Sequence, residues 1–283
     1  MTAVSVIIPA FNRAAKVARA VASVLDQTFQ DYELIVVEDG SEDGTRYVLE
    51  QFGSRIRLLF HEKNRGVSAA RNTGILASRS PLIAFLDSDD HWLSEKLKTQ
   101  VEFFRAHSEA VACQTEEIWI RKGRRVNPMK KHAKPSGKIF EPSLRLCLVS
   151  PSAVMLRRTV LDEVGLFDES LPACEDYDLW LRISCRYPIH LIPSPLLVKE
   201  GGSPDQLSAC VEGLDRYRIM AMVKLIRSGA LCREQIDATL HELTTKCTIY
   251  GKGCMRRGKI EEGDYYLALP ETIGKEVRAF TPT

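Results

Sequence analysis

Four short apolar runs constrain the fold of this chain more than any other feature of its sequence. They read VSVII, ELIVV, IRLLF and LIAFL, at residues 4–8, 33–37, 56–60 and 82–86. Such runs, rich in β-branched and large aliphatic residues, are typical of strands covered on both faces. Helical spacing is present between them, around Val17, Val21 and Val24 and in segments 66–78 and 93–106. Alternating strands and helices predict an α/β fold with a doubly wound, mostly parallel sheet and ligands at the carboxyl ends of its strands.

The overall composition limits the classes of partner. The 283 residues, 45% of them hydrophobic, can bury the core of one large α/β domain with appendages or of two modest domains. A formal net charge of +2 gives no global field for nucleic acid, which we exclude as a partner. Eight scattered cysteines without a C-x-x-C pair are expected to be reduced thiols. Without leader features or an apolar stretch near the roughly 20 residues of a membrane span, a soluble, cytoplasmic protein is expected.

The last apolar run leads directly into three carboxylates. The stretch LIAFLDSDDHW places Asp87, Asp89 and Asp90 within four positions at the end of a predicted strand. A single Asp there would indicate a turn or a helix cap. Three crowded carboxylates repel one another unless a cation lies among them, and oxygen ligands of this kind suit Mg²⁺ or Mn²⁺ held together with substrate phosphates. We therefore predict a divalent metal as cofactor.

Polar stretches also follow the first two strands. The first strand ends in PAFNR, which contributes Pro9, Phe11, Asn12 and Arg13, and the second ends in IVVEDGSEDGT, which contributes Asp39. The glycines of the second stretch by themselves indicate only a turn. Because parallel strands end at the same edge of a sheet, an aromatic ring, an amide and a carboxylate would converge there. Such a set can stack on and hydrogen-bond a nucleobase.

Four motifs together carry a family resemblance. They are SVIIPAFNR, QTFQDYELIVVEDGSEDGT, GVSAARNTGI and FLDSDDHWLSEKL, in this order through about residues 4–105. Any one of them alone is a weak signal. In combination they closely resemble the nucleotide-binding half of the family 2 glycosyltransferases, which have the GT-A fold. The resemblance implies an inverting transferase that uses a nucleotide-diphosphate sugar, with UDP-sugars the favoured donors, and usually a divalent metal.

The resemblance also assigns roles to single residues. It implies that Asp39 hydrogen-bonds the base with Phe11 beside it, and that Arg71 lies near the diphosphate. It places Asp87 at the ribose or sugar and makes Asp89 the metal ligand. The full donor-binding set is Pro9, Phe11, Asn12, Arg13, Asp39, Arg71, Asp87 and Ser88.

A second acidic pair lies in FDESLPACEDYDLWLRI, where Glu175 and Asp176 precede a helix whose apolar stripe includes Trp180. From residue chemistry alone, both acids can be helix caps that favour the helix dipole. The family carries its catalytic base at an ED pair before such a helix, and the resemblance assigns this role to Asp176. A base there would take the proton of an attacking acceptor hydroxyl, and one displacement would invert the anomeric centre.

Two positions depart from the family pattern. Glu38 stands where the family more often has Asp, which keeps the charge on a longer arm. Ser203 stands where family members often have a His that can approach the metal or the diphosphate. Without this imidazole, the metal is expected to rest on Asp89, phosphate oxygens and water, so that metal and donor bind with mutual dependence.

The pattern of the chain changes after about residue 107 and again after about residue 207. We expect a GT-A domain at 1–206, made of a nucleotide-binding half at 1–106 and an acceptor and catalytic half at 107–206, and then a helical region at 207–283. Within that region, 240–269 resembles one tetratricopeptide helix–turn–helix without a second copy. One unit cannot make a solenoid, which indicates a packing appendage.

A basic stretch at 120–138 concerns the acceptor. Its simplest interpretation is a solvated hairpin around Lys122 and Gly123. The alternative is that its arginines and lysines meet a phosphate-bearing acceptor at the inner face of a membrane. The expected acceptor is therefore a saccharide or a lipid-linked sugar, with peripheral membrane contact in the second case.

Three other functions compete with glycosyl transfer. FLDSDD resembles the DxD of aspartyl-phosphate phosphatases, but Asp90 and His91 follow Asp89 where a hydroxyl residue is expected. A sugar nucleotidyltransferase should have a Gly-rich phosphate loop after its first strand, where this chain has PAFNR. The non-enzymatic alternative is a nucleotide-sugar-binding module without turnover.

Overall fold

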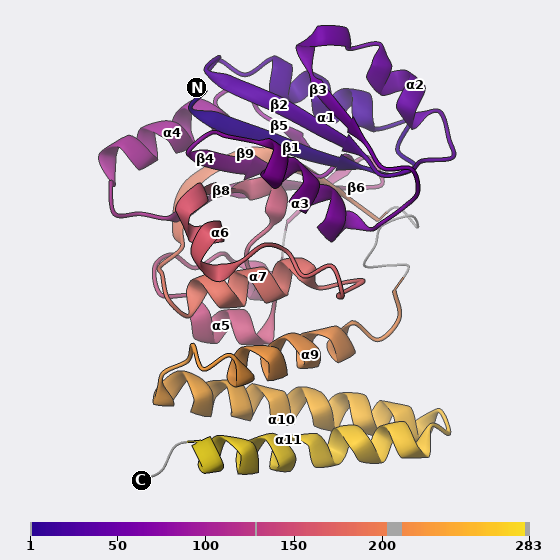
Figure 1. The fold of residues 1–283 in the computed structure, drawn as a ribbon, viewed down its shortest axis with the longest axis vertical. Helices are drawn as coiled ribbons and strands as arrows, with labels where there is room; N and C mark the ends of the chain where they lie inside the picture. Colours follow the sequence, from indigo (N-terminus) through magenta and orange to yellow (C-terminus); the bar gives the residue numbers. More distant parts are fainter. Residues whose placement is uncertain (1, 128, 203–210, 281–283) are drawn as a thin grey trace.

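The computed structural model describes residues 2–127, 129–202 and 211–280, and its centre is one mixed sheet (Figure 1). The strands follow the order β3-β2-β1-β4-β8-β6-β9-β5 across the sheet, and β7 pairs with β6. Their bounds are β1 Val4–Ala10, β2 Tyr32–Glu38, β3 Arg57–Phe60, β4 Leu82–Phe85, β5 His91–Trp92, β6 Ala112–Arg121, β7 Arg124–Val126, β8 Val154–Arg157 and β9 His190–Gly201.

The first half of the sheet is parallel, as the four apolar runs predict. β1 pairs in parallel with both β2 and β4, and β2 pairs in parallel with β3. Because side chains alternate along β1, Val6 packs with helix α1 (Val17–Leu25) and helix α4 (Lys96–Ala106) on one face. Ile7 packs with helix α3 (Val67–Ala77) on the other. Helices on both faces confirm the doubly wound prediction, and the short helix α2 (Thr45–Glu50) follows β2.

The second half of the sheet is mixed, which the sequence patterns did not specify. β8 lies antiparallel to β4 and β6, and β9 runs parallel to β6 and antiparallel to β5. Strand β5 begins immediately after the acidic cluster, and His91 pairs with Val198. This pairing brings the carboxyl end of β9 beside Asp90, where the backbone N–H of Glu200 donates to Asp90 Oδ1 at 3.1 Å.

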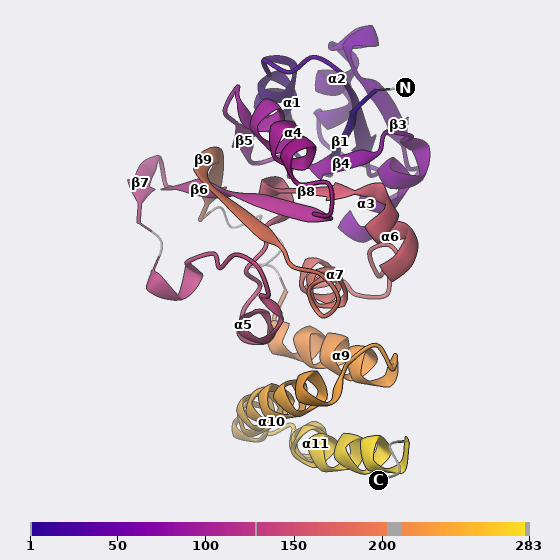
Figure 2. The same cartoon turned by 90° about the vertical axis from the view of Figure 1, so that its left-hand side faces the viewer.

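The remaining helices lie below the sheet (Figures 1 and 2). Their bounds are α5 Phe140–Arg145, α6 Arg158–Val164, α7 Glu175–Ser184, α9 Leu214–Arg227, α10 Arg233–Arg256 and α11 Ile260–Phe280, with short 3₁₀ turns at Gly53–Arg55, Lys130–His132 and Pro151–Ala153. Trp180 is buried in a core cluster beneath the sheet, as its place in the apolar stripe predicts. A second cluster joins α5 and α7 to the three last helices.

The predicted helix–turn–helix at 240–269 is the pair α10 and α11. The helices approach so closely that a Cβ at Gly251 would lie 2.9 Å from the carbonyl oxygen of Gly263, which explains glycine there. The domain boundary predicted at residue 206 falls outside the described residues and stays a prediction. The seven described cysteines are free thiols. Among the described helices, none combines the length and the apolar content needed to cross a bilayer.

The basic stretch forms the predicted hairpin. Lys122 and Gly123, with φ of 49° and 71°, make the two-residue turn between β6 and β7. The exposed cations around it are Arg121, Lys122, Arg124, Arg125, Lys130 and Lys131. Lys134 differs, because its side chain is buried and its Nζ lies 2.7 Å from Glu117 Oε1. The hairpin is therefore solvated at its tip and anchored at its base.

Candidate active site

A cavity of about 720 Å³ lies at the carboxyl ends of β1 and β4 and is bordered by the start of α7, by β9 and by α9. All ten predicted site residues line it: Pro9, Phe11, Asn12, Arg13, Asp39, Arg71, Asp87, Ser88, Asp89 and Asp176. These residues come from segments up to 167 positions apart in the chain. Strand ends and one helix start thus converge where a doubly wound sheet binds its ligands.

Both carboxylate oxygens of Asp39 are hydrogen-bonded to one loop of the protein. Its Oδ1 lies 2.5 Å from His61 Nδ1 and accepts from the backbone N–H of Arg65 at 2.9 Å. Its Oδ2 accepts from Asn64 Nδ2 at 3.2 Å and from the Gly66 N–H at 2.9 Å. The carboxylate therefore fixes the loop that leads into α3, and its predicted contact with a base stays a prediction.

The PAFNR stretch forms the rim of the cavity. Phe11 is 39% exposed, so its ring is available for stacking. Asn12 has a left-handed φ of 50°, and its Oδ1 accepts from the backbone N–H of Glu42 at 2.9 Å. The N–H of Arg13 donates to Thr45 Oγ1 at 2.7 Å. The loops after β1 and β2 are thus held together, as expected for one binding edge.

The three carboxylates of the acidic cluster have different surroundings. Asp87 Oδ1 accepts from Arg71 Nη2 at 2.7 Å, and Asp90 Oδ2 accepts from Ser152 Oγ at 2.7 Å. No other described residue donates a hydrogen bond to the carboxylate of Asp89, which lines the cavity. Burial and the charge of Asp87 raise the pKa of Asp89, and burial raises that of Asp90 still more. The positive charges of Arg13 and Lys16 oppose the rise in the pKa of Asp89, and a cation bound beside Asp89 would act in the same direction.

Asp89 fits the predicted role of metal ligand. The described residues contain no group of three or more His, Cys, Asp and Glu side chains arranged to hold an ion. Mg²⁺ and Mn²⁺ with phosphate ligands need one or two protein carboxylates and otherwise keep water. A metal here would rest on Asp89 and the phosphates of a ligand. Ser203, where the family often has His, lies outside the described residues.

Arg71 joins Asp87 of the acidic cluster to Glu175 of the ED pair. Its Nη1 donates to Glu175 Oε1 and its Nη2 to Asp87 Oδ1, both at 2.7 Å, although Glu175 lies 104 residues away. The guanidinium packs over the ring of Phe167 at 5.1 Å. Burial opposes its charge, but the two carboxylates outweigh burial and raise the pKa of Arg71. Both terminal nitrogens are committed to carboxylates, a role that sequence reasoning missed.

The two acids of the ED pair differ in access to the cavity. Glu175 is 4% exposed and bound to Arg71, and burial together with the charge of Asp176 raises its pKa. Asp176 is half-buried in the first turn of α7. Its Oδ1 accepts from the Tyr177 N–H at 2.7 Å, and its Oδ2 accepts from Cys147 Sγ at 3.4 Å. Asp176 is thus the member of the pair that can meet a ligand.

Several lining residues were not predicted from the sequence. They are Asn64, Asp90, Cys147, Cys174, Glu175, Lys199 and Arg218, among others. Glu175 and Asp90 neighbour predicted residues, so motif adjacency was an available signal. Lys199 and Arg218 come from β9 and α9, where no motif marks them. Arg218 donates to Asp215 Oδ1 at 2.9 Å, while its Nε is buried without a hydrogen-bond partner among the described residues.

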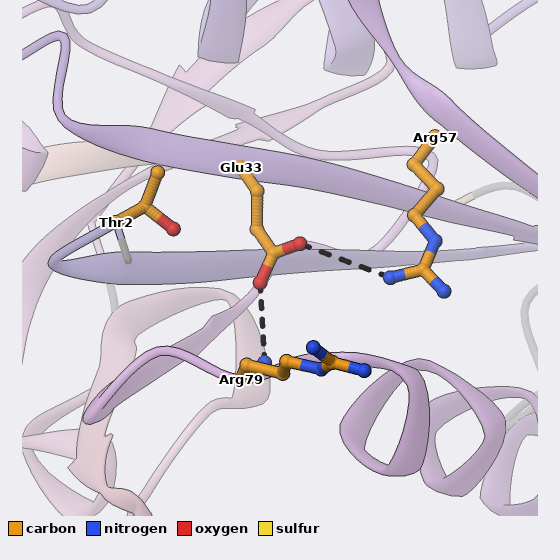
Figure 3. Close-up of a pocket in the computed structure, with 4 residues that line it drawn as sticks. All are labelled: Thr2, Glu33, Arg57 and Arg79. Atoms are coloured by element: carbon orange, nitrogen blue, oxygen red, sulfur yellow. Dashed lines mark hydrogen bonds and ion pairs between the residues drawn. The ribbon is translucent and has the colours of Figure 1, made fainter.

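A second hollow lies at the opposite end of the sheet, near the start of β2 and β3 (Figure 3). Its lining residues are Thr2, Glu33, Arg57 and Arg79. Glu33 Oε1 accepts from Ser5 Oγ at 2.6 Å and from the Arg79 N–H at 3.3 Å, and Oε2 lies 4.0 Å from Arg57 Nη1. None of the predicted site residues lines this hollow, so the larger cavity is the candidate active site.

Comparison with known proteins finds a matching family model and several curated relatives. The family model described as glycosyl transferase family 2 matches residues 5–165. The Escherichia coli protein UDP-Glc:alpha-D-GlcNAc-diphosphoundecaprenol beta-1,3-glucosyltransferase WfgD is 36% identical over 181 residues, which cover 64% of this chain and 69% of that protein. Three uncharacterized glycosyltransferases from Rickettsia species are longer, and the chain spans 26% to 40% of their length.

Solved structures share the fold at low sequence identity. The structure of S. aureus TarS 1–349 in complex with UDP-GlcNAc has a TM-score of 0.68 at 17% identity and covers 96% of this chain and 92% of that one. Mannosyltransferase PcManGT from Pyrobaculum calidifontis, in complex with GDP-Man and Mn²⁺, has a TM-score of 0.67 at 16% identity and covers 96% and 75%. The predicted GT-A-type fold is confirmed, and the family match rejects the phosphatase and sugar nucleotidyltransferase alternatives. The chain is an enzyme that belongs to glycosyl transferase family 2.

Proposed function

We propose that this enzyme moves a sugar from a nucleotide-diphosphate sugar to an acceptor hydroxyl with inversion. One observation carries the proposal: Asp87, Asp89 and Asp176 line a single cavity, in which Arg71 bridges Asp87 to Glu175, the neighbour of Asp176. This arrangement supports a displacement in which the leaving diphosphate and the attacking hydroxyl use different carboxylates. UDP-sugars are the proposed donors, since the E. coli relative is named for UDP-Glc and the S. aureus structure holds UDP-GlcNAc.

The proposed chemistry assigns each carboxylate one task. Asp176 takes the proton of the acceptor hydroxyl, and contacts from the Tyr177 N–H and Cys147 fix its two oxygens. Glu175 holds Arg71 and is not the base, because it is buried in that ion pair. Phe11 offers its exposed ring to the base of the nucleotide. A bound Mg²⁺ or Mn²⁺, held by Asp89, would supply positive charge to the departing diphosphate.

The proposed acceptor is a saccharide, and a lipid-linked one is the more specific case. The E. coli relative is named for a diphosphoundecaprenol-linked acceptor. Six exposed cations surround the β6–β7 hairpin, and none forms an ion pair with a described carboxylate. Basic side chains of this kind are attracted to anionic lipid headgroups. This favours a cytoplasmic enzyme in peripheral contact with the inner membrane face.

A thermal-shift screen tests the donor class. Binding of the correct nucleotide sugar to the folded state raises apparent stability, by about 2.7 kcal/mol at a ligand concentration 100 times the Kd. We expect a UDP-sugar to raise the melting temperature, and to raise it further with Mn²⁺. No shift with any UDP-, GDP- or dTDP-sugar, with or without metal, would contradict the proposed function. Release of the sugar from the shifting donor, once an acceptor is added, separates a transferase from a binding module.

Asp89→Ala is expected to eliminate the metal-dependent part of donor binding. Asp89 is the cluster carboxylate that no other described residue hydrogen-bonds, so its loss removes the protein ligand of the ion. Isothermal titration of Mn²⁺ into the enzyme with saturating UDP measures the effect, with Asp26→Ala, outside the cavity, as control. An unchanged Mn²⁺ affinity would move the metal to another carboxylate, and Asp87→Ala is then the next variant.

A further inference from the structure

Lys199 is a cavity cation with unused hydrogen-bonding capacity. It lies near the end of β9, is half-buried, and lines the cavity. In the described part of the chain its ammonium makes one hydrogen bond, from Nζ to Ser150 Oγ at 3.2 Å. No described carboxylate oxygen lies within salt-bridge distance of it. An ammonium has three donors, so two remain for a ligand.

Four carboxylates surround Lys199 at longer range. They are Glu117, Asp90, Asp87 and Asp176. Burial disfavours the ammonium charge, but these carboxylates outweigh burial and raise the pKa of Lys199. Glu117 itself is fixed by Lys134 and by Trp119 Nε1, which donates to its Oε2 at 2.8 Å. Burial alone would raise the pKa of Glu117, but Lys134 and Lys199 together lower this pKa to about 2. Lys199 is thus held charged, close to both the acidic cluster and the proposed base.

The two remaining N–H donors of Lys199 suit an anionic ligand that enters the cavity. On the proposed function, the anionic part of the donor is its diphosphate. Arg71, which the family resemblance places near the diphosphate, is 3% exposed, and its charge is balanced by Asp87 and Glu175 at 2.7 Å each. Lys199 lines the same cavity and forms no ion pair with a described carboxylate. A compact ammonium is also a common phosphate ligand in proteins.

We propose that Lys199 binds the phosphoryl oxygens of the donor diphosphate and acts beside the metal as a second, built-in cation. The inference rests on the proposed function and adds a residue to it. It implies that UDP keeps measurable affinity when the metal is removed, because part of the charge on the diphosphate is still neutralised. It also implies that the contribution of Lys199 depends on the phosphates and not on the base.

The test is isothermal titration calorimetry of UDP and of uridine with the metal-free enzyme in EDTA. A charge-assisted hydrogen bond contributes roughly 10- to 100-fold in affinity, so Lys199→Met should weaken UDP by about that factor and leave uridine unchanged. Lys199→Arg should keep UDP within a few-fold of wild type. Lys63 is an exposed lysine beside the cavity-lining Asn64 and serves as the control. Lys63→Met removes the same charge without removing the proposed contact with the diphosphate, so it should change UDP affinity less than two-fold.

The outcomes separate this inference from the proposed function. If wild type binds UDP and Lys199→Met binds it equally well in EDTA, the inference is wrong and the proposed function stands. An equal loss of affinity for UDP and for uridine would also overturn the inference, because that pattern indicates a damaged cavity. If the wild type binds no nucleoside diphosphate with or without Mn²⁺, both fail. Circular dichroism melting of Lys199→Met and Lys199→Arg establishes that each variant is folded, and Lys199→Gln replaces a variant that is not.

Discussion

Asp176→Asn is expected to lower glycosyl transfer by about 10²- to 10⁴-fold, the range contributed by a positioned general base, while donor affinity stays within a few-fold. The amide keeps the shape of the side chain and can still contact Cys147 and the Tyr177 N–H, but it cannot take a proton. Transfer is measured as sugar release from labelled donor in the presence of acceptor, and donor binding by calorimetry with Mn²⁺. In the proposed mechanism Asp176 contacts only the acceptor hydroxyl. The substitution should therefore lower kcat and leave the donor Kd nearly unchanged.

The neighbouring acid supplies the contrast for this experiment. Glu175→Gln changes the same pair by the same chemistry, but Glu175 is buried and hydrogen-bonded to Arg71. We expect Glu175→Gln to lower stability and to retain measurable transfer at a temperature where it is folded. Full turnover by Asp176→Asn would remove Asp176 as the base. Loss of turnover in a folded Glu175→Gln would transfer the role to Glu175.

Arg71→Met is expected to cost about 3 to 5 kcal/mol of unfolding free energy, the usual effect of removing one partner from a buried ion pair. Arg71 is 3% exposed, and its loss leaves Glu175 buried with an uncompensated charge. Burial already raises the pKa of Glu175, so the orphaned acid takes up a proton more readily than usual. The cost should therefore be smaller at pH 5 than at pH 8, as measured by urea unfolding at both values.

A double variant separates the ion pair from simple loss of packing. If charge causes the effect, Arg71→Met combined with Glu175→Gln should be more stable than Arg71→Met alone, because the buried charge is gone. Arg158→Met is a useful comparison, since Arg158 donates mainly to backbone carbonyls and to Ser78. A cost near zero for Arg71→Met, or one that does not change with pH, would contradict the structural role of the bridge.

The sequence predicts what local pattern determines and misses what tertiary contacts determine. The apolar runs predict β1, β2 and β4 because a strand covered on both faces is continuously apolar, and they place Asp39 and Asp87 at strand ends for the same reason. The run at 56–60 also forms a strand, but β3 lies at the edge of the sheet and its side chains are partly exposed. The antiparallel insertion of β8 has no such signal, since four residues after a 3₁₀ turn carry no distinctive period. From the sequence, the positive charge among the carboxylates was attributed to a metal ion alone. Arg71 and Lys199 supply fixed charge there as well, the first through an ion pair with Asp87, 16 residues away, and the second at longer range from 112 residues away.

The wall of the cavity supplied by α9 has a consequence for the diversity of such enzymes. The family model ends at residue 165, whereas Leu214 and Arg218 enter the cavity from a helix that begins about fifty residues later. Under the proposed function, these side chains lie on the side of Asp176, and the strand ends that would hold the donor contain neither of them. Exchange of the three last helices between relatives would then alter which hydroxyl is glycosylated while the nucleotide sugar stays the same. Recombination within the segment that encodes these helices would in this way give a lineage new linkages.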